Sequence, residues 1–217
     1  MPTHAFAIAA AVSAILAIAA DWNERRHPAF YILKPLTTVL IIGIAAQSPP
    51  GDARWMLLAA LGLSLLGDIC LMFEGNKFFI GGLGSFLLAH LLFIPVLLHG
   101  IAQPALPPWS AALALYGILL FAWLLPRTGS LKFAVGLYGL ALIGLAFAAI
   151  ARWHGRHDLP AELAMLGALL FVLSDSSLAI RKFVGAYAGA QAVILSTYWA
   201  AIGLIAYAAT LPGWDLL

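Results

Sequence analysis

Long apolar segments separated by short polar interruptions run through the whole chain. Eight of them can be delimited, at residues 5–20, 30–47, 54–73, 79–99, 108–125, 131–151, 161–180 and 188–211. A helix needs about 20 apolar residues to cross the hydrocarbon core of a bilayer, and most of these segments are near that length. Prolines and glycines punctuate the interruptions, which are too short to hold a further domain. The pattern predicts an all-α polytopic membrane protein, with one domain over residues 1–217 built as a bundle of eight transmembrane helices.

The composition agrees with this prediction and excludes other classes of protein. Hydrophobic residues make up 64% of the chain and charged residues only 9%, whereas about a quarter of a soluble domain is charged. The net charge of +2 is small and scattered, so no nucleic-acid partner is expected. The single cysteine excludes a disulfide within one chain. No lysine or arginine precedes Arg25, so the first segment is expected to be a retained span rather than a cleaved signal peptide.

The distribution of basic residues favours one orientation of the bundle, because cytoplasmic loops carry an excess of lysine and arginine. Eight basic residues lie in or beside the odd-numbered loops: Arg25, Arg26, Lys34, Lys77, Arg127, Lys132, Arg181 and Lys182. Three lie on the opposite side: Arg54, Arg152 and Arg156. We therefore expect an integral protein of the bacterial inner membrane, with the odd-numbered loops in the cytoplasm and both termini outside it.

Two aspartates lie where an apolar helix least readily accommodates them. Asp68 and Asp175 share the surrounding pattern L-x-x-L-x-D-x-x-L. A carboxylate at membrane depth costs about 3 kcal/mol on insertion scales, and such residues usually mark a functional site. Each is followed after six residues by a charged residue, Glu74 or Arg181, which predicts a common depth of about 9 Å from the cytoplasmic boundary. The offset of 107 residues also pairs segments three and four with seven and eight, as in a parallel 4+4 repeat.

Several other polar side chains fall within the apolar segments, and the candidates among them are Lys34, His90, Ser174, Thr197 and Tyr198. We expect them to converge with the aspartates on a cavity that opens toward the cytoplasm. Each also has a structural interpretation, since a lysine near a helix end extends to the headgroups and hydroxyls bond to nearby carbonyls. Histidine or tyrosine can serve packing alone, and a buried aspartate can make a structural hydrogen bond. A zinc site built from several histidines is not expected, because His90 is the only histidine deep in a segment.

Several short motifs, taken in order, resemble a known family. They are Lys34-Pro35, Gly67-Asp68, Phe79-x-x-Gly82-Leu83-x-x-Phe86-x-x-Ala89-His90, Ser174-Asp175-x-x-Leu178-Ala179 and Thr197-Tyr198. With the eight apolar segments they look like the YhhN-like lysoplasmalogenase family over nearly the whole chain. The resemblance implies a hydrolase that cleaves the vinyl ether bond of lysoplasmalogen, releasing a fatty aldehyde and glycerophospho-ethanolamine or glycerophospho-choline. It implies no metal or other cofactor. The expected partners are a lysophospholipid substrate within the bilayer and membrane lipids, with no obligate protein partner.

The candidate residues suit this reaction. Hydrolysis of a vinyl ether begins with proton transfer to the alkenyl carbon, which creates an oxocarbenium ion that water then attacks. In the related chemistry of glycosides, one carboxylic acid protonates while one carboxylate stabilises the cation or activates water. We expect Asp68 and Asp175 to share these roles, in an order that the sequence leaves open. His90 is expected to relay a proton or orient water, and Lys34 to meet the lipid phosphate.

The remaining candidates are assigned to substrate binding: Tyr198, as a donor to the substrate oxygen, with Thr197 and Ser174 beside it. Two alternatives stay open. Intramembrane acids, a histidine and an internal repeat are also features of a proton-coupled small-molecule transporter. A purely structural membrane protein would tolerate asparagine at both aspartates without any change beyond stability.

Overall fold

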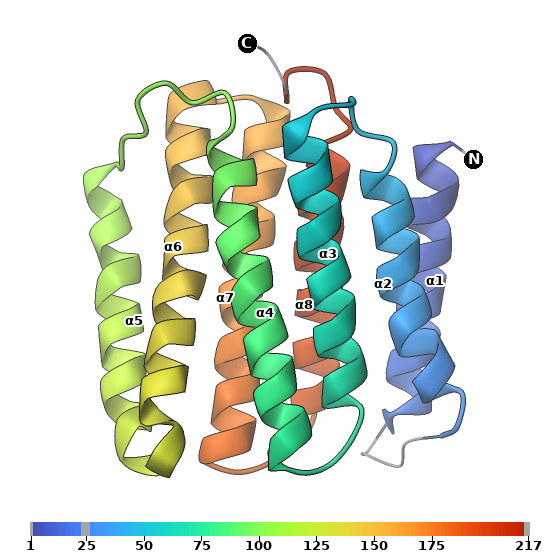
Figure 1. Ribbon diagram of the computed structural model, residues 1–217, viewed down its shortest axis with the longest axis vertical. Coiled ribbons are helices and arrows are strands. Elements are labelled where there is room, and N and C mark those ends of the chain that lie inside the picture. The colour runs from blue at the N-terminus through green and yellow to red at the C-terminus, as the bar shows by residue number, and fades with distance from the viewer. Residues whose placement is uncertain (1, 23–26, 215–217) are drawn as a thin grey trace.

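The described residues of the chain form eight α-helices connected by short loops (Figure 1). The computed structural model describes residues 2–22 and 27–214, and within these ranges it contains no β-strand. The helices are α1 (Thr3–Ala20), α2 (Phe30–Ala45), α3 (Asp52–Leu71), α4 (Asn76–Leu98), α5 (Ala111–Leu124), α6 (Lys132–Arg156), α7 (Leu159–Phe183) and α8 (Ala190–Ala208). Short 3-10 turns, η2 (Pro108–Ser110), η3 (Leu125–Arg127) and η4 (Gly129–Leu131), flank α5. Each α-helix overlaps one predicted span, so the predicted all-α bundle is confirmed.

The helices have the length and composition of membrane spans. Seven of the described helices, counted with their flanking 3-10 turns, are long and apolar enough to cross a membrane, and α2 is a shorter apolar helix of 16 residues. Large apolar side chains point outward from several of them; Ile8, Ile118 and Leu140 are 66%, 65% and 74% exposed. A surface of this kind is costly in water and suited to lipid. The protein is an integral membrane protein.

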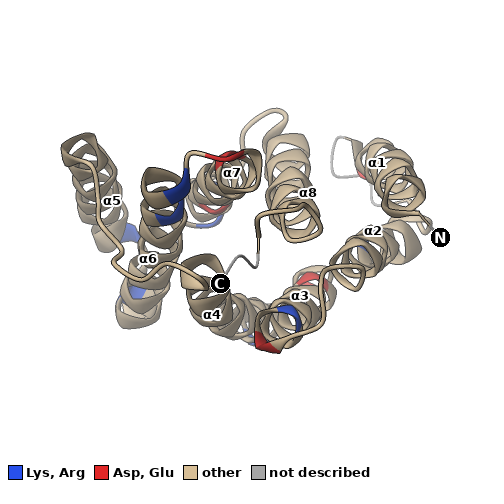
Figure 2. Cartoon of the chain, turned by 90° about the horizontal axis from the view of Figure 1, so that it is seen from above, with Lys and Arg blue, Asp and Glu red and all other residues tan. Residues whose placement is uncertain are grey.

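Seven helices form a closed ring, and α5 lies outside it (Figure 2). Around the ring α1 packs on α2, α2 on α3, α3 on α4, α4 on α6, α6 on α7, α7 on α8 and α8 back on α1. Helices α2 and α8 also touch, whereas α5 packs mainly on α6 and α7. The pairs α3–α4 and α7–α8 are the two most extensively packed, whereas α5 packs on α6 much less than α1 packs on α2. The repeat itself stays a prediction.

The two ends of the bundle carry different loops (Figure 1). The described ends of the chain lie together with the α2–α3, α4–α5 and α6–α7 loops. The other end, formed by the α3–α4, α5–α6 and α7–α8 loops, is called the odd-loop end below. Lys77, Lys132 and Lys182 lie near helix termini at that end. Arg25 and Arg26, which entered the charge comparison, lie outside the described residues.

The odd-loop ends of α3 and α7 differ from the predicted spans. Helix α3 ends three residues after Asp68 and turns at Gly75, which has a φ of 113°. Helix α7 continues for eight residues after Asp175, because nothing interrupts it before Gly185 with its φ of 146°. Arg181 therefore belongs to the last turn of α7. The two acids lie about 4.5 Å and 12 Å from their helix ends along the axis, and their common depth stays a prediction.

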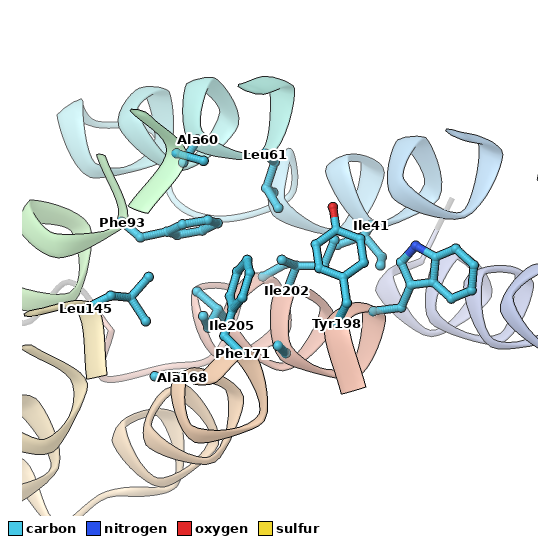
Figure 3. Packing of buried hydrophobic residues seen from close by; sticks show 14 of the residues in the cluster. Ile41, Ala60, Leu61, Phe93, Leu145, Ala168, Phe171, Tyr198, Ile202 and Ile205 are labelled. Atoms are coloured by element: carbon cyan, nitrogen blue, oxygen red, sulfur yellow. The ribbon is translucent and has the colours of Figure 1, made fainter. Parts of the chain in front are cut away.

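Aromatic side chains fill the ring, and close helix contacts hold them there. Phe93, Phe171 and Tyr198, from α4, α7 and α8, are buried and lie among the interior residues (Figure 3). A Cβ atom added at Gly167 would lie only 2.8 Å from the carbonyl oxygen of Ala201. Helices α7 and α8 therefore pack backbone against backbone, which fixes where their polar side chains lie.

A buried arginine joins three segments at the end opposite the odd-loop end. Helix α6 extends past the predicted span, so Arg152 lies inside it and is fully buried rather than part of a loop. Its guanidinium donates to the carbonyls of His99 at 2.9 Å and Trp214 at 2.7 Å, and it stacks 3.8 Å from the centre of the Trp214 ring. The end of α4 and the segment after α8 are thus tied to α6.

Candidate functional site

Asp68 is the centre of a buried polar cluster between α2, α3 and α8. Its side chain is 2% exposed, and its Oδ2 atom accepts hydrogen bonds from the Thr38 hydroxyl at 2.6 Å and the Tyr198 hydroxyl at 2.8 Å. The Lys34 ammonium lies 3.6 Å from Oδ1. Trp199 donates its indole N–H to the Thr38 hydroxyl at 3.3 Å. The carboxylate therefore has a countercharge and two hydroxyl donors, which a buried charge needs.

The sequence brings these groups together by simple helical spacing. Lys34 and Thr38 are four residues apart in α2, so they lie on the same face of that helix. Contact of α2 with both α3 and α8 then directs this face toward Asp68 and Tyr198. Lys34 is 4% exposed, so the surrounding helices cover its side chain.

Asp175 is the centre of a second cluster, between α4, α6 and α7. Its Oδ2 atom accepts a hydrogen bond of 2.5 Å from the Tyr138 hydroxyl, and it lies 3.7 Å from Nε2 of His90. The His90 ring is fully buried and packs edge to face on Tyr138 and Phe171, with ring centres 5.1 Å and 4.6 Å away. Neither nitrogen of this ring forms a hydrogen bond with the described protein atoms. Leaving a buried polar group unbonded costs about 1–3 kcal/mol, which a purely structural histidine would not be expected to carry.

Aromatic rings separate the two clusters. The Tyr198 ring lies 5.6 Å from that of Phe86 and 5.7 Å from that of Phe171, which in turn packs on His90. Within the described chain no hydrogen bond or ion pair joins the two carboxyl groups; each has its own partners. The proposal that Asp68 and Asp175 share one reaction stays a prediction.

A cavity of about 610 Å³ lies between α4, α5, α6 and α7. On α4 and α7 its lining residues lie in the halves nearer the odd-loop end, whereas on α5 they follow most of the helix. Its wall is mostly apolar, and its polar lining residues are Tyr116, Lys132, Tyr138, Asp175 and Ser176. Ile118, Phe133 and Leu140 line it and are also 65%, 81% and 74% exposed, so the cavity opens to the lipid-facing surface. The volume is typical of small-molecule sites, which measure about 300–1,000 Å³. An apolar chain can therefore enter from the membrane and reach Asp175.

The other predicted site residues lie outside the lining of this cavity. Ser174 donates to the carbonyl of Ile194 at 3.0 Å, which ties α7 to α8. Thr197 donates to the carbonyl of Val193 at 2.6 Å, within its own helix. Lys34, His90, Tyr198 and Asp68 are buried behind the wall. Their predicted roles in binding and catalysis stay predictions.

Sequence reasoning missed Thr38, Tyr116 and Tyr138, which belong to the two clusters and the cavity. Tyr138 carried a usable signal, because it comes six residues after Lys132 and so lies about 9 Å above the start of α6, near the depth predicted for the aspartates. Thr38 was marked by its spacing from Lys34. Tyr116 had no such signal, since α5 is apolar on all sides.

The family to which the chain belongs follows from comparison with known proteins. The model of the YhhN family matches residues 29–209. The chain is a member of the YhhN family. It is 34% identical over 181 residues to a lysoplasmalogenase of Mycobacterium bovis, an alignment covering 80% of this chain and 65% of the relative. It is 33% identical over 164 residues to lysoplasmalogenase TMEM86B of Mus musculus, covering 75% and 66%. Membrane protein YhhN of Escherichia coli O157:H7 is 30% identical over 172 residues, covering 77% and 80%.

The matched region places the site in the shared part of the YhhN family. Both clusters and the cavity, from Lys34 to Tyr198, lie within residues 29–209, whereas α1 lies before them. The alignments span less than two thirds of the length of the lysoplasmalogenases named above. No solved structure matches the chain.

Proposed function

We propose that the protein hydrolyses the vinyl ether bond of lysoplasmalogen, releasing a fatty aldehyde and glycerophospho-ethanolamine or glycerophospho-choline. The observation that carries the proposal is the position of Asp175 in the wall of an apolar cavity that opens to lipid. Its carboxyl group accepts a hydrogen bond from Tyr138 there. The names of the mycobacterial and mouse relatives supply the substrate class. An apolar tail fits the lining, and the acid supplies the proton that a vinyl ether requires.

Asp175 is the proposed proton donor in the first step. Tyr138 donates to Oδ2, which leaves Oδ1 of the carboxylic acid to carry the proton. Transfer of this proton to the alkenyl carbon farther from the ether oxygen breaks the double bond. The cation that results is shared between the neighbouring carbon and the ether oxygen, beside the newly formed Asp175 carboxylate.

The same carboxylate serves as base in the second step. Water adds to the cationic carbon and gives one proton to Asp175, which restores the acid and leaves a hemiacetal. The hemiacetal then collapses, with its hydroxyl proton passing to the glycerol oxygen as the carbon–oxygen bond breaks. His90, 3.7 Å from Asp175 and without a hydrogen bond to the described residues, is the proposed relay for these protons.

Asp68 has a different proposed role, because it is buried behind the cavity wall. It holds the Tyr198 hydroxyl, and the Tyr198 ring in turn supports Phe86, which lines the cavity. The two carboxyl groups, which were expected to share the chemistry, thus have different proposed roles. Asp175 exchanges protons with the substrate, and Asp68 is a positioning residue for the aromatic wall.

A panel of three lipids tests the proposed function. Purified protein is incubated with lysoplasmalogen, plasmalogen and an ester lysophospholipid, and aldehyde and fatty acid are both measured. Aldehyde from lysoplasmalogen is the expected product. Fatty acid from the ester would indicate a lysophospholipase instead. Proton-dependent flux in proteoliposomes without turnover of any of the three lipids would favour the transporter alternative.

We also propose that the protein lies in a bacterial inner membrane with the odd-loop end in the cytoplasm. The support is the position of Lys77, Lys132 and Lys182 at that end. Lys77 and Gln103 are exposed at opposite ends of the bundle, so each can be replaced by cysteine in a Cys70→Ser background. A membrane-impermeant maleimide added to intact cells is expected to label Gln103→Cys, and to label Lys77→Cys only after permeabilisation. The reverse pattern would invert the orientation.

A further inference from the structure

A second pair of polar side chains lines the cavity beside Asp175. Tyr116 of α5 donates its hydroxyl to the Ser176 hydroxyl of α7 at 2.8 Å, and both residues belong to the cavity lining. Ser176 is 4% exposed, whereas Tyr116 is 41% exposed at the lipid-facing side of the cavity. The two hydroxyls thus form a polar patch in this mostly apolar wall, next to Asp175.

The pair has one donor and one acceptor available for a ligand. The neighbouring serines of α7 are committed, since Ser174 donates to the Ile194 carbonyl and Ser177 to the Leu173 carbonyl. Among the described residues Ser176 has no acceptor for its own proton, because in its contact with Tyr116 it receives a hydrogen bond. The Tyr116 oxygen, in turn, keeps lone pairs free to accept. This combination matches an alcohol, which both donates and accepts.

We propose that the Tyr116–Ser176 pair binds the free sn-2 hydroxyl of the lysophospholipid and thereby selects lipids that lack an sn-2 acyl chain. The inference rests on the proposed function, because it takes the alkenyl chain to lie with its double bond at Asp175. Ser176 donates to the sn-2 oxygen, and the sn-2 hydroxyl donates to the Tyr116 oxygen. An acylated sn-2 oxygen has no proton to donate to Tyr116.

The positions of the two pairs suit the shape of the substrate. Asp175 and Ser176 are consecutive in α7, so their Cα atoms are about 3.8 Å apart and their side chains diverge by about 100° around the helix. They reach neighbouring points of one wall. In the substrate, five bonds separate the carbon that receives the proton from the sn-2 oxygen, and an extended chain advances about 1.2 Å per bond. The alkenyl carbon and the sn-2 oxygen are thus about 6 Å apart, a distance at which the neighbouring side chains of Asp175 and Ser176 can contact one group each.

Steric exclusion adds to the loss of the hydrogen bond. Tyr116 is held in the wall by its contact with Ser176, and α5 meets the ring mainly through α6 and α7. An acyl chain at sn-2 would have to displace the Tyr116 side chain from this position. The pair therefore discriminates against plasmalogens in two ways. The Tyr116 oxygen receives no hydrogen bond from an acylated sn-2 position, and the sn-2 acyl chain clashes with the Tyr116 side chain.

A double-variant protein and a modified substrate, assayed in all combinations with the wild type and the natural substrate, test the role proposed for the Tyr116–Ser176 pair. Wild-type protein and the Tyr116→Phe/Ser176→Ala variant are each assayed with lysoplasmalogen and with its 2-deoxy analogue, which lacks only the sn-2 hydroxyl. We expect wild-type protein to prefer lysoplasmalogen by about tenfold in kcat/KM, because the analogue loses both hydrogen bonds to the pair. In the variant this preference is expected to disappear. Ser177→Ala, which loses only a bond to its own helix, is the control and should keep it.

The outcomes separate this assignment from a structural role and from failure of the proposed function. If the variant is slower on both substrates but keeps the tenfold preference, the pair only anchors α5 and the assignment is wrong. Equal rates on both substrates in wild-type protein would also overturn it. If wild-type protein releases no aldehyde from either lipid, the proposed function fails. In that case the melting temperature of wild-type protein is measured with each of the two lipids, which tests the preference for the sn-2 hydroxyl without any turnover. Equal stabilisation by both lipids overturns the assignment.

Discussion

Replacing Asp175 by asparagine is expected to lower kcat for aldehyde release by at least a factor of about 100, the usual contribution of a general acid. The amide cannot deliver a proton to the alkenyl carbon, but its oxygen can still accept the hydrogen bond from Tyr138. The variant should therefore keep its fold and its cavity. Aldehyde production from lysoplasmalogen by purified protein is the measurement.

Ser177→Ala is the matched control for this substitution. Ser177 lies two residues from Asp175 in α7 and donates only to the carbonyl of Leu173 in the same helix. Its loss should leave both activity and thermal stability close to those of the wild type. If Asp175→Asn, with an unchanged melting temperature, released aldehyde at the wild-type rate, Asp175 would have no part in the chemistry.

Asp68→Asn is expected to destabilise the protein by about 3–5 kcal/mol, because it leaves a buried ammonium without its countercharge. Lys34 and Asp68 are 3.6 Å apart, and their side chains are 5% and 2% exposed. The double variant Lys34→Met/Asp68→Asn removes both charges and should recover most of the lost stability. Ser64→Ala, one turn away in α3 with a hydroxyl bonded to its own helix, is the control. Thermal unfolding in lipid nanodiscs measures all three.

The same variants test whether Asp68 acts by positioning or in the reaction itself. As a positioning residue it should affect kcat/KM in proportion to the disturbance of Tyr198 and Phe86, so the double variant should regain activity along with stability. A double variant that is as stable as the wild type but inactive would instead place the Asp68 carboxylate in the chemistry, as the sequence had suggested.

The eight helices could be predicted from the sequence, because every membrane span needs a long apolar segment and this chain consists almost entirely of such segments. The ends of the helices were harder to predict from the sequence. Arg181 and Lys182 were assigned to a loop, yet they continue α7, since long basic side chains can extend to the headgroups from the last turn of a helix. Arg152 was also assigned to a loop and instead lies buried, satisfied by the carbonyls of His99 and Trp214.

Several of the buried polar residues could be picked out from the sequence, but their arrangement could not. Apolar surroundings marked Asp68, Asp175, His90 and Tyr198 as unusual, and the structure places all of them in two neighbouring clusters. Which residues meet depends on how each helix is rotated and on which helices are neighbours. That Tyr138 would reach Asp175, or that α5 would lie outside the ring, follows from packing between segments far apart in sequence.

The position of Asp175 along the bundle has a consequence for where the protein can work. Asp175 lies eight residues before the end of α7, in the half of that helix nearer the odd-loop end, and the cavity beside it opens to lipid. A lipid whose headgroup stays at one surface of the membrane can bring its sn-1 linkage to Asp175 only from the leaflet on that side. Lipids of the opposite leaflet would first have to cross the bilayer. Turnover by this protein would therefore deplete one leaflet and depend on the rate at which the other resupplies it.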